Sequence, residues 1–172
     1  FDAYVIPLAN AFRLQYQAAL VRTTELVRRL RIPVVVLGVG AQGTVDHGWD
    51  AIKPIEGAVK DFVSAVLDRS PTIGVRGEAT REYLNGLGFR DVEVIGCPSM
   101  FTWGDTIPVE RKAATIDEQS NVAITISPYR AAMGRIAMSA HARYPRLTYF
   151  AQDLPTLRLL FDGVPLPGGT PD

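Results

Sequence analysis

The 172-residue sequence predicts an α/β fold, with a doubly wound parallel sheet in roughly its first hundred residues and the start of a second α/β unit after a linker. Short apolar runs rich in β-branched residues alternate with amphipathic segments of helical period. The segments between the runs are long enough to be right-handed crossover helices, which make consecutive strands parallel. We therefore expect a domain at 1–103, a linker at 104–120, a partial second α/β domain at 121–162 and an irregular tail at 163–172.

The first three elements follow from apolar runs and the prolines beside them. A strand is predicted at 3–6, because this apolar run ends in a loop that carries the polar Asn10. A helix is expected at about 19–30, where apolar residues recur on one helical face, and Pro33 ends it. The continuous run at 34–37 is typical of a parallel strand covered on both faces.

The same alternation continues through the rest of the first domain. A helix is predicted at 54–67, because proline is tolerated in the first turn and an apolar stripe follows. A short strand at 72–75 leads into a helix at 78–87, which Gly88 stops. A further strand is expected at 91–95.

Periodicity fades over the predicted linker, and a new series of strands and helices begins after it. Strands are predicted at 122–126 and 147–150, and helices at 131–143 and 155–161. Two such units make about half of a normal α/β domain. Either they extend the first sheet, or the chain is a fragment of a longer protein.

Composition excludes several classes of function. Eighteen basic and eighteen acidic residues cancel, so we expect neither a nucleic-acid partner nor an anionic membrane. We expect no transmembrane segment and a cytoplasmic location, because no apolar run approaches the length that crosses a bilayer. His47 and His141 are too few and too far apart to predict a metal cluster. The single cysteine, Cys97, has no sequence neighbour that would lower its pKa, so we expect a small buried residue.

Candidate binding residues follow the predicted strands, because ligands of open parallel sheets bind beyond the carboxyl ends of the strands. Arg76 leaves a strand where a helix begins, so its guanidinium and the free amides of that helix would converge on one anion. The alternative is an ion pair between Arg76 and Glu78. We interpret Glu78 itself as a first-turn acid that interacts with the helix dipole. The predicted substrate-binding set is Arg76, Asn10, Gly40, Gln42, Gly43, Glu78 and Arg130.

Gly38, Gly40 and Gly43 match the G-x-G-x-x-G pattern of dinucleotide-binding proteins. That pattern requires a helix that opens directly on the glycines, whereas polar residues intervene here before Pro54. No acidic residue ends the next strand to hold a ribose, since Arg76 stands there. We therefore expect a glycine-rich turn that brings backbone amides near a ligand, and no resident cofactor.

Several of these segments together resemble the polysaccharide pyruvyl transferase family. The resemblance rests on residues 72–84 and their continuation through Gly88 to residues 92–99, with residues 5–10 and 37–43 agreeing in order and spacing. It covers roughly the first hundred residues.

The resemblance implies a Rossmann-like first domain within a fold like that of GT-B glycosyltransferases. It also implies transfer of pyruvate from phosphoenolpyruvate to a saccharide acceptor as a ketal, in the synthesis of cell-surface polysaccharide (exopolysaccharide). Arg76 would then bind phosphoenolpyruvate, with Arg130 as a lesser candidate from the second domain. A homo-oligomer is left open.

Family members carry an Arg-x-His element late in the second domain, and this sequence has Ser139 two residues before His141. We therefore expect the chain either to be inactive alone or to belong to a divergent member. Two rival functions stay open at this point. One is a GT-B glycosyltransferase that uses a nucleotide sugar, and the other is a non-catalytic, truncated binding domain.

Overall fold

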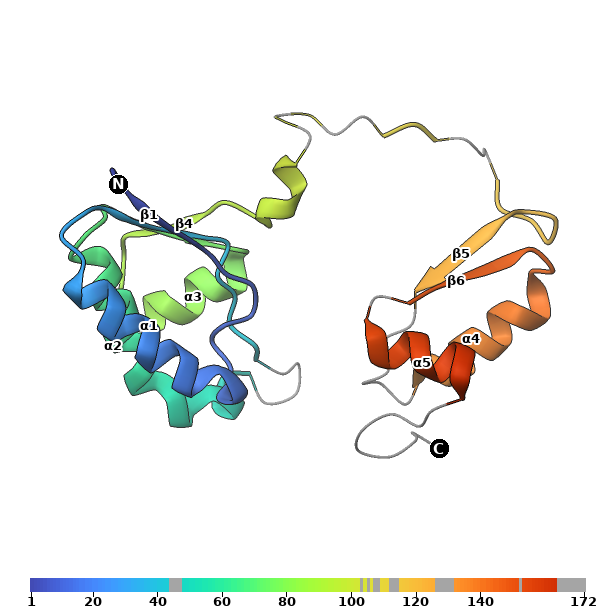
Figure 1. The fold of residues 1–172 in the computed structure, drawn as a ribbon, viewed down its shortest axis with the longest axis horizontal. Coiled ribbons are helices and arrows are strands. Elements are labelled where there is room, and N and C mark those ends of the chain that lie inside the picture. The colour runs from blue at the N-terminus through green and yellow to red at the C-terminus, as the bar shows by residue number, and fades with distance from the viewer. Residues whose placement is uncertain are drawn as a thin grey trace. The chain divides into compact units, whose positions relative to one another are not determined.

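The fold was analysed in a computed structural model of the chain. It describes all residues except 44–47, 103, 105, 107–108, 112–114, 126–131, 152 and 164–172, and it leaves the side chains of 132–133 and 159–160 undescribed. The chain forms two compact units, Phe1–Pro108 and Val109–Asp172 (Figure 1).

Two pairs of parallel strands form the sheet of the first unit. Strand β1 (Tyr4–Pro7) pairs with β2 (Val34–Leu37), and β3 (Ile73–Val75) pairs with β4 (Val92–Val94). A parallel bridge between Val39 and Val75 joins the two pairs. The described strands thus run in the order β1-β2-β3-β4, and the expectation of a parallel α/β arrangement is confirmed.

Backbone hydrogen bonds connect the two central strands, β2 and β3, near their carboxyl ends. The amide of Val39 donates to the carbonyl of Gly74 over 3.2 Å, and the amide of Arg76 donates to the carbonyl of Val39 over 2.9 Å. Because these bonds lie at the carboxyl ends of β2 and β3, they hold together the edge where a ligand is expected.

Three helices connect the strands: α1 (Gln17–Arg29), α2 (Glu56–Leu67) and α3 (Glu78–Gly86). They lie on one side of the sheet in Figure 1. This agrees with the strand order, because right-handed crossovers that always step in the same direction place every helix on the same face. Helices on the second face, which a doubly wound sheet requires, are not among the elements described in this unit.

The burial of side chains along β1 and β2 reflects the packing of helices against one face of the sheet. Val34 and Val36 face the helices and are fully buried, whereas Val35 and Leu37 are half-buried. Val5, which pairs with Val35, is 51% exposed. The continuous apolar run at β2 is thus covered on one face only by the described elements.

The core lies between the sheet and α1 and α2. Phe12 and Phe62 meet edge to face at its centre, with ring centroids 6.2 Å apart. Short 3-10 helices, which the apolar periodicity does not reveal, precede α1 (Leu14–Tyr16), precede α2 (Asp50–Ile55) and follow β4 (Pro98–Phe101).

The second unit contains one parallel strand pair and two helices. Strand β5 (Val122–Thr125) pairs with β6 (Leu147–Phe150), and the helices are α4 (Ala132–Arg143) and α5 (Leu154–Asp162). Asp153 caps α5 by accepting a hydrogen bond from the amide of Thr156 over 2.8 Å. In neither unit does a described helix have the length and apolar character needed to span a bilayer.

Candidate functional site

The loops that follow β1, β2 and β3 are hydrogen-bonded to one another. The amide of Phe12 donates to the carbonyl of Gly40 over 3.1 Å, and the amide of Gln42 donates to the carbonyl of Phe12 over 3.0 Å. Between Gly40 and Gln42, the amide of Ala41 donates to the hydroxyl of Thr80 on α3 over 3.0 Å. Three segments far apart in sequence therefore form one connected surface at the carboxyl edge of the sheet.

Two of the predicted glycines are explained by close contacts within this surface. A Cβ atom on Gly40 would lie 2.8 Å from the side-chain oxygen of Asn10, so these two predicted residues are brought together. A Cβ atom on Gly43 would lie 2.7 Å from the carbonyl of Gly48 and from the ring of Trp49. These glycines thus allow the loops to pack closely, and Gln42 between them is exposed.

Arg76 and Glu78 do not pair with each other. Glu78, the first residue of α3, forms an ion pair with Arg81 one turn later, which fits its interpretation as a first-turn acid. The side chain of Arg76 is partly buried, and its Nε is fully buried without a hydrogen-bond partner in the part of the chain that the structure describes. A buried guanidinium N–H without an acceptor is energetically unfavourable, so a ligand that accepts a hydrogen bond from it would be stabilised.

The prediction of a buried, unperturbed Cys97 is wrong. The thiol is partly exposed, and its sulfur lies 3.1 Å from the hydroxyl oxygen of Ser99. Hydrogen bonding to the hydroxyl and backbone of Ser99, together with the charge of Arg76, lowers the pKa of Cys97 below its ordinary value. The sequence signal that the prediction overlooked is the hydroxyl of Ser99, two residues after the cysteine.

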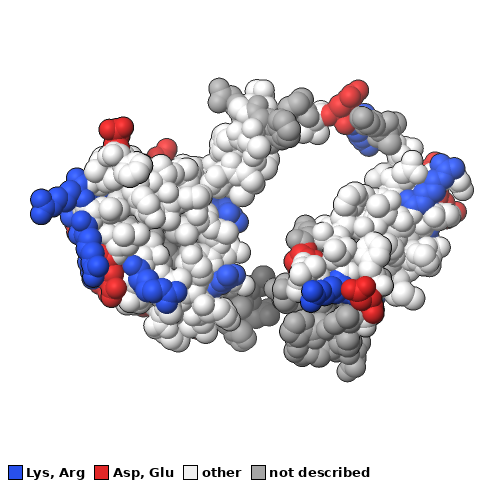
Figure 2. Space-filling model, viewed as in Figure 1, with Lys and Arg blue, Asp and Glu red and all other residues white. Residues whose placement is uncertain are grey.

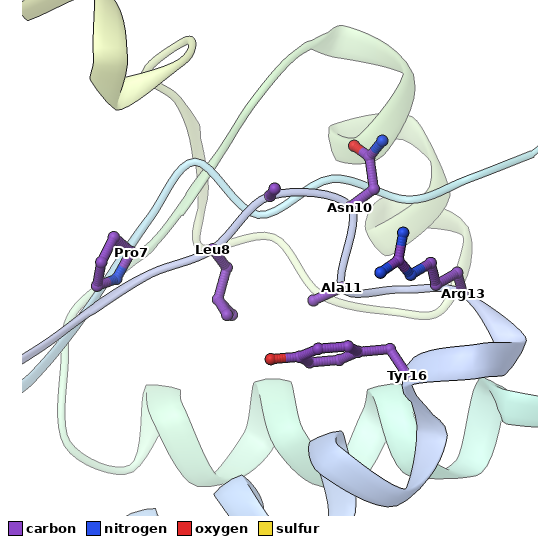
Figure 3. A pocket seen from close by; sticks show the side chains of 7 residues that line it. Pro7, Leu8, Asn10, Ala11, Arg13 and Tyr16 are labelled. Carbon is purple, nitrogen blue, oxygen red and sulfur yellow. The ribbon is translucent and has the colours of Figure 1, made fainter. Parts of the chain in front are cut away.

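A pocket of about 250 Å³ lies beside the loop after β1 (Figure 3). Asn10 and Arg13 stand toward one end of it, Pro7 and Leu8 toward the other, and the ring of Tyr16 lies along one side. The guanidinium carbon of Arg13 is 5.9 Å from the centroid of the Tyr16 ring. Arg13 and Tyr16 were absent from the predicted set, because that set stopped at the first polar residue after the strand.

Arg130 of the predicted set and the two histidines lie outside the described part of the chain or away from this edge. Arg130 and His47 are not among the described residues. His141 lies in α4 of the second unit. No group of three or more metal-binding side chains occurs within the described ranges.

One face of the first unit shows both basic and acidic side chains (Figure 2). The formal charges of the whole sequence cancel, so no net positive charge attracts a polyanion. Selective binding of an anion would therefore depend on individual residues such as Arg76 and Arg13.

The fold and its strand-end residues define an α/β protein with cationic and amide groups at the carboxyl edge of a parallel sheet. The model of the polysaccharide pyruvyl transferase family matches residues 11–154. The chain belongs to this family, as the sequence resemblance indicated. The family is a transferase family, and its description places polysaccharide among its substrates. No curated protein and no solved structure matches the chain.

Proposed function

We propose that this protein acts in the transfer of pyruvate from phosphoenolpyruvate to a saccharide, where the pyruvate becomes a ketal. Membership of the polysaccharide pyruvyl transferase family supports the reaction class. The strand-edge geometry of the first unit supports an anionic donor. We also propose that the two units correspond to Rossmann-like halves of a GT-B-like fold, since each contains parallel strands connected through helices.

The observation that carries the donor assignment is the state of Arg76. Its Nε is buried without a partner among the described residues, and its neighbour Glu78 is engaged by Arg81. Arg76 also directly precedes the N-cap of α3, where no side chain caps the helix. An oxyanion bound here would receive charge-assisted hydrogen bonds from the guanidinium and from first-turn amides.

The proposed reaction balances as follows. The C2 carbon of phosphoenolpyruvate forms bonds to two saccharide oxygens, and its bond to the phosphate oxygen breaks. The two hydroxyl groups release two protons, of which one reaches the methylene carbon to make the methyl group and the other leaves with inorganic phosphate. In this scheme Arg76 orients the donor and stabilises the charge on the departing phosphate.

The test compares phosphoenolpyruvate binding to the unaltered chain, to Arg76→Gln and to the control Arg90→Gln. Arg90 is an exposed arginine that precedes β4, at the opposite end of the strand pair. Hydrogen bonds to charged groups contribute about 1.5–3 kcal/mol, so Arg76→Gln should weaken binding by roughly 10- to 150-fold. Arg90→Gln should leave it unchanged.

Calorimetric titration with phosphoenolpyruvate, and separately with a nucleotide sugar, distinguishes the proposal from glycosyl transfer. Binding of phosphoenolpyruvate that depends on Arg76 supports the assignment. Stronger binding of the nucleotide sugar would contradict it, as would equal affinity of the Arg76 and Arg90 variants for phosphoenolpyruvate.

A further inference from the structure

The pocket beside the loop after β1 carries a positive charge that no described acid neutralises. Arg13 is exposed, and its guanidinium lies over the ring of Tyr16. Among the described residues, ion pairs are formed by other arginines and a lysine and not by Arg13. The pocket lining, which runs from Pro7 to Tyr16, contains no carboxylate. Its electrostatics therefore favour a ligand with a negative charge.

The shape and remaining chemistry of the pocket indicate a ring with polar substituents. Leu8, Pro7 and the half-buried Tyr16 provide apolar surface, while the amide of Asn10 offers both donors and acceptors near Arg13 (Figure 3). A volume of about 250 Å³ is below the range of about 300–1,000 Å³ that holds drug-sized molecules. One sugar ring is an appropriate size, with any longer chain extending into solvent.

The pocket is connected to the segment that carries Arg76. Gly40, which approaches the Asn10 side chain, is followed by Ala41, whose amide donates to Thr80 on α3. The amide of Arg76 in turn donates to Val39, the residue before Gly40. The strand-end loops therefore hold Arg13 and Arg76 on a common edge of the first unit as two separate cationic positions.

We propose that this pocket binds one ring of the saccharide substrate and selects a ring that carries a carboxylate, which Arg13 recognises. This inference rests on the proposed function, in which Arg76 binds the phosphoenolpyruvate donor. Arg13 would donate hydrogen bonds from its planar guanidinium to the carboxylate, Asn10 would bind a neighbouring hydroxyl group, and Tyr16 would contact the ring. Neutral sugars would bind more weakly, because they leave the guanidinium unpaired.

The test measures binding of glucuronate, glucose and inorganic phosphate to the full chain by NMR titration. The variants are Arg13→Gln, Arg13→Lys and the control Arg22→Gln, which removes an exposed charge from α1. Glucuronate should bind more tightly than glucose. Arg13→Gln should weaken glucuronate at least about tenfold, Arg13→Lys should retain part of the affinity, and Arg22→Gln should have no effect.

Three results would overturn the inference: equal affinity for glucuronate and glucose, inorganic phosphate competing as well as glucuronate, or an Arg13→Gln variant that binds glucuronate normally. A loss of glucuronate binding in Arg13→Gln supports the inference when the circular dichroism spectrum is unchanged, because that spectrum shows that the variant is folded. Phosphoenolpyruvate affinity should be the same in Arg13→Gln as in the unaltered chain. If phosphoenolpyruvate binding does not depend on Arg76 but glucuronate binding depends on Arg13, the proposed function alone is rejected. If phosphoenolpyruvate binding depends on Arg76 but glucuronate binding does not depend on Arg13, this inference alone is rejected.

Discussion

Gly74 in β3 offers a direct test of how the carboxyl edge of the sheet is held. A Cβ atom at this position would lie 2.7 Å from the carbonyl oxygen of Val36 and 2.8 Å from the Cδ1 atom of Ile95. Real Cβ atoms essentially never approach other atoms within 3.0 Å, so something must move. The Ile95 side chain can rotate, but Val36 lies within the paired part of β2 and its carbonyl cannot yield without displacing the strand.

The substitution Gly74→Ala should therefore destabilise the first unit by about 1–3 kcal/mol, the usual range for overpacking a filled core. It should also weaken phosphoenolpyruvate binding, because the Gly74 carbonyl accepts the Val39 hydrogen bond that helps to hold the segment before Arg76. The matched control is Gly57→Ala in α2, where an added Cβ would meet no atom within 4 Å. That change should stabilise the protein by roughly 0.4–1 kcal/mol, because alanine loses less backbone entropy on folding.

Urea unfolding, followed by tryptophan fluorescence, measures the change in stability that each of the two glycine substitutions causes. Trp49 packs against the core of the first unit, so its fluorescence reports on the unfolding of that unit. Equal stability of Gly74→Ala and Gly57→Ala would refute the close β2–β3 contact. A Gly74→Ala variant that is destabilised but binds phosphoenolpyruvate normally would refute the proposed link to Arg76.

Two further predictions concern titrating groups. Burial, with a smaller contribution from the charge of Glu56, raises the pKa of Tyr83 to about 12. The folded state therefore favours the protonated phenol, and this contribution to the free energy of unfolding should be fully present below the ordinary tyrosine pKa of about 10 and be lost as the pH rises toward 12. Tyr83→Phe should abolish this loss of stability in urea unfolding at alkaline pH. It should change stability little at neutral pH, because the hydroxyl has no partner among the described residues. An unchanged dependence of stability on alkaline pH would contradict the prediction. At the sheet edge, Ser99→Ala should shift the pH profile of Cys97 alkylation upward, because the variant loses the hydroxyl that stabilises the thiolate. Identical profiles would show that Ser99 has no such role.

Most secondary structure was predictable because its signals are local. Strand β2 and strand β6 coincide with the predicted runs at 34–37 and 147–150, and α3 begins at the predicted Glu78. Apolar spacing, proline and glycine act over a few residues, so they can be read without knowledge of the fold. The parallel arrangement followed from the length of the connections alone.

The candidate site was only partly predictable. Asn10, the glycines after β2 and Arg76 were found because the carboxyl ends of parallel strands share one edge. Arg13 and Tyr16 were not found, because the loop after β1 and its short 3-10 helix (Leu14–Tyr16) line the pocket only once the chain is folded. Nothing in the local pattern distinguishes such a loop from a solvent-exposed connection.

The sequence by itself determined the order of strands and helices, the absence of a net charge and the family to which the chain belongs. Tertiary structure decided the partners of individual side chains: Glu78 pairs with Arg81, the Arg76 Nε is buried without a described partner, and Ser99 perturbs Cys97. The physical reason is one of range. Periodicity arises from neighbours along the chain, whereas burial and hydrogen bonding depend on segments that only packing brings together.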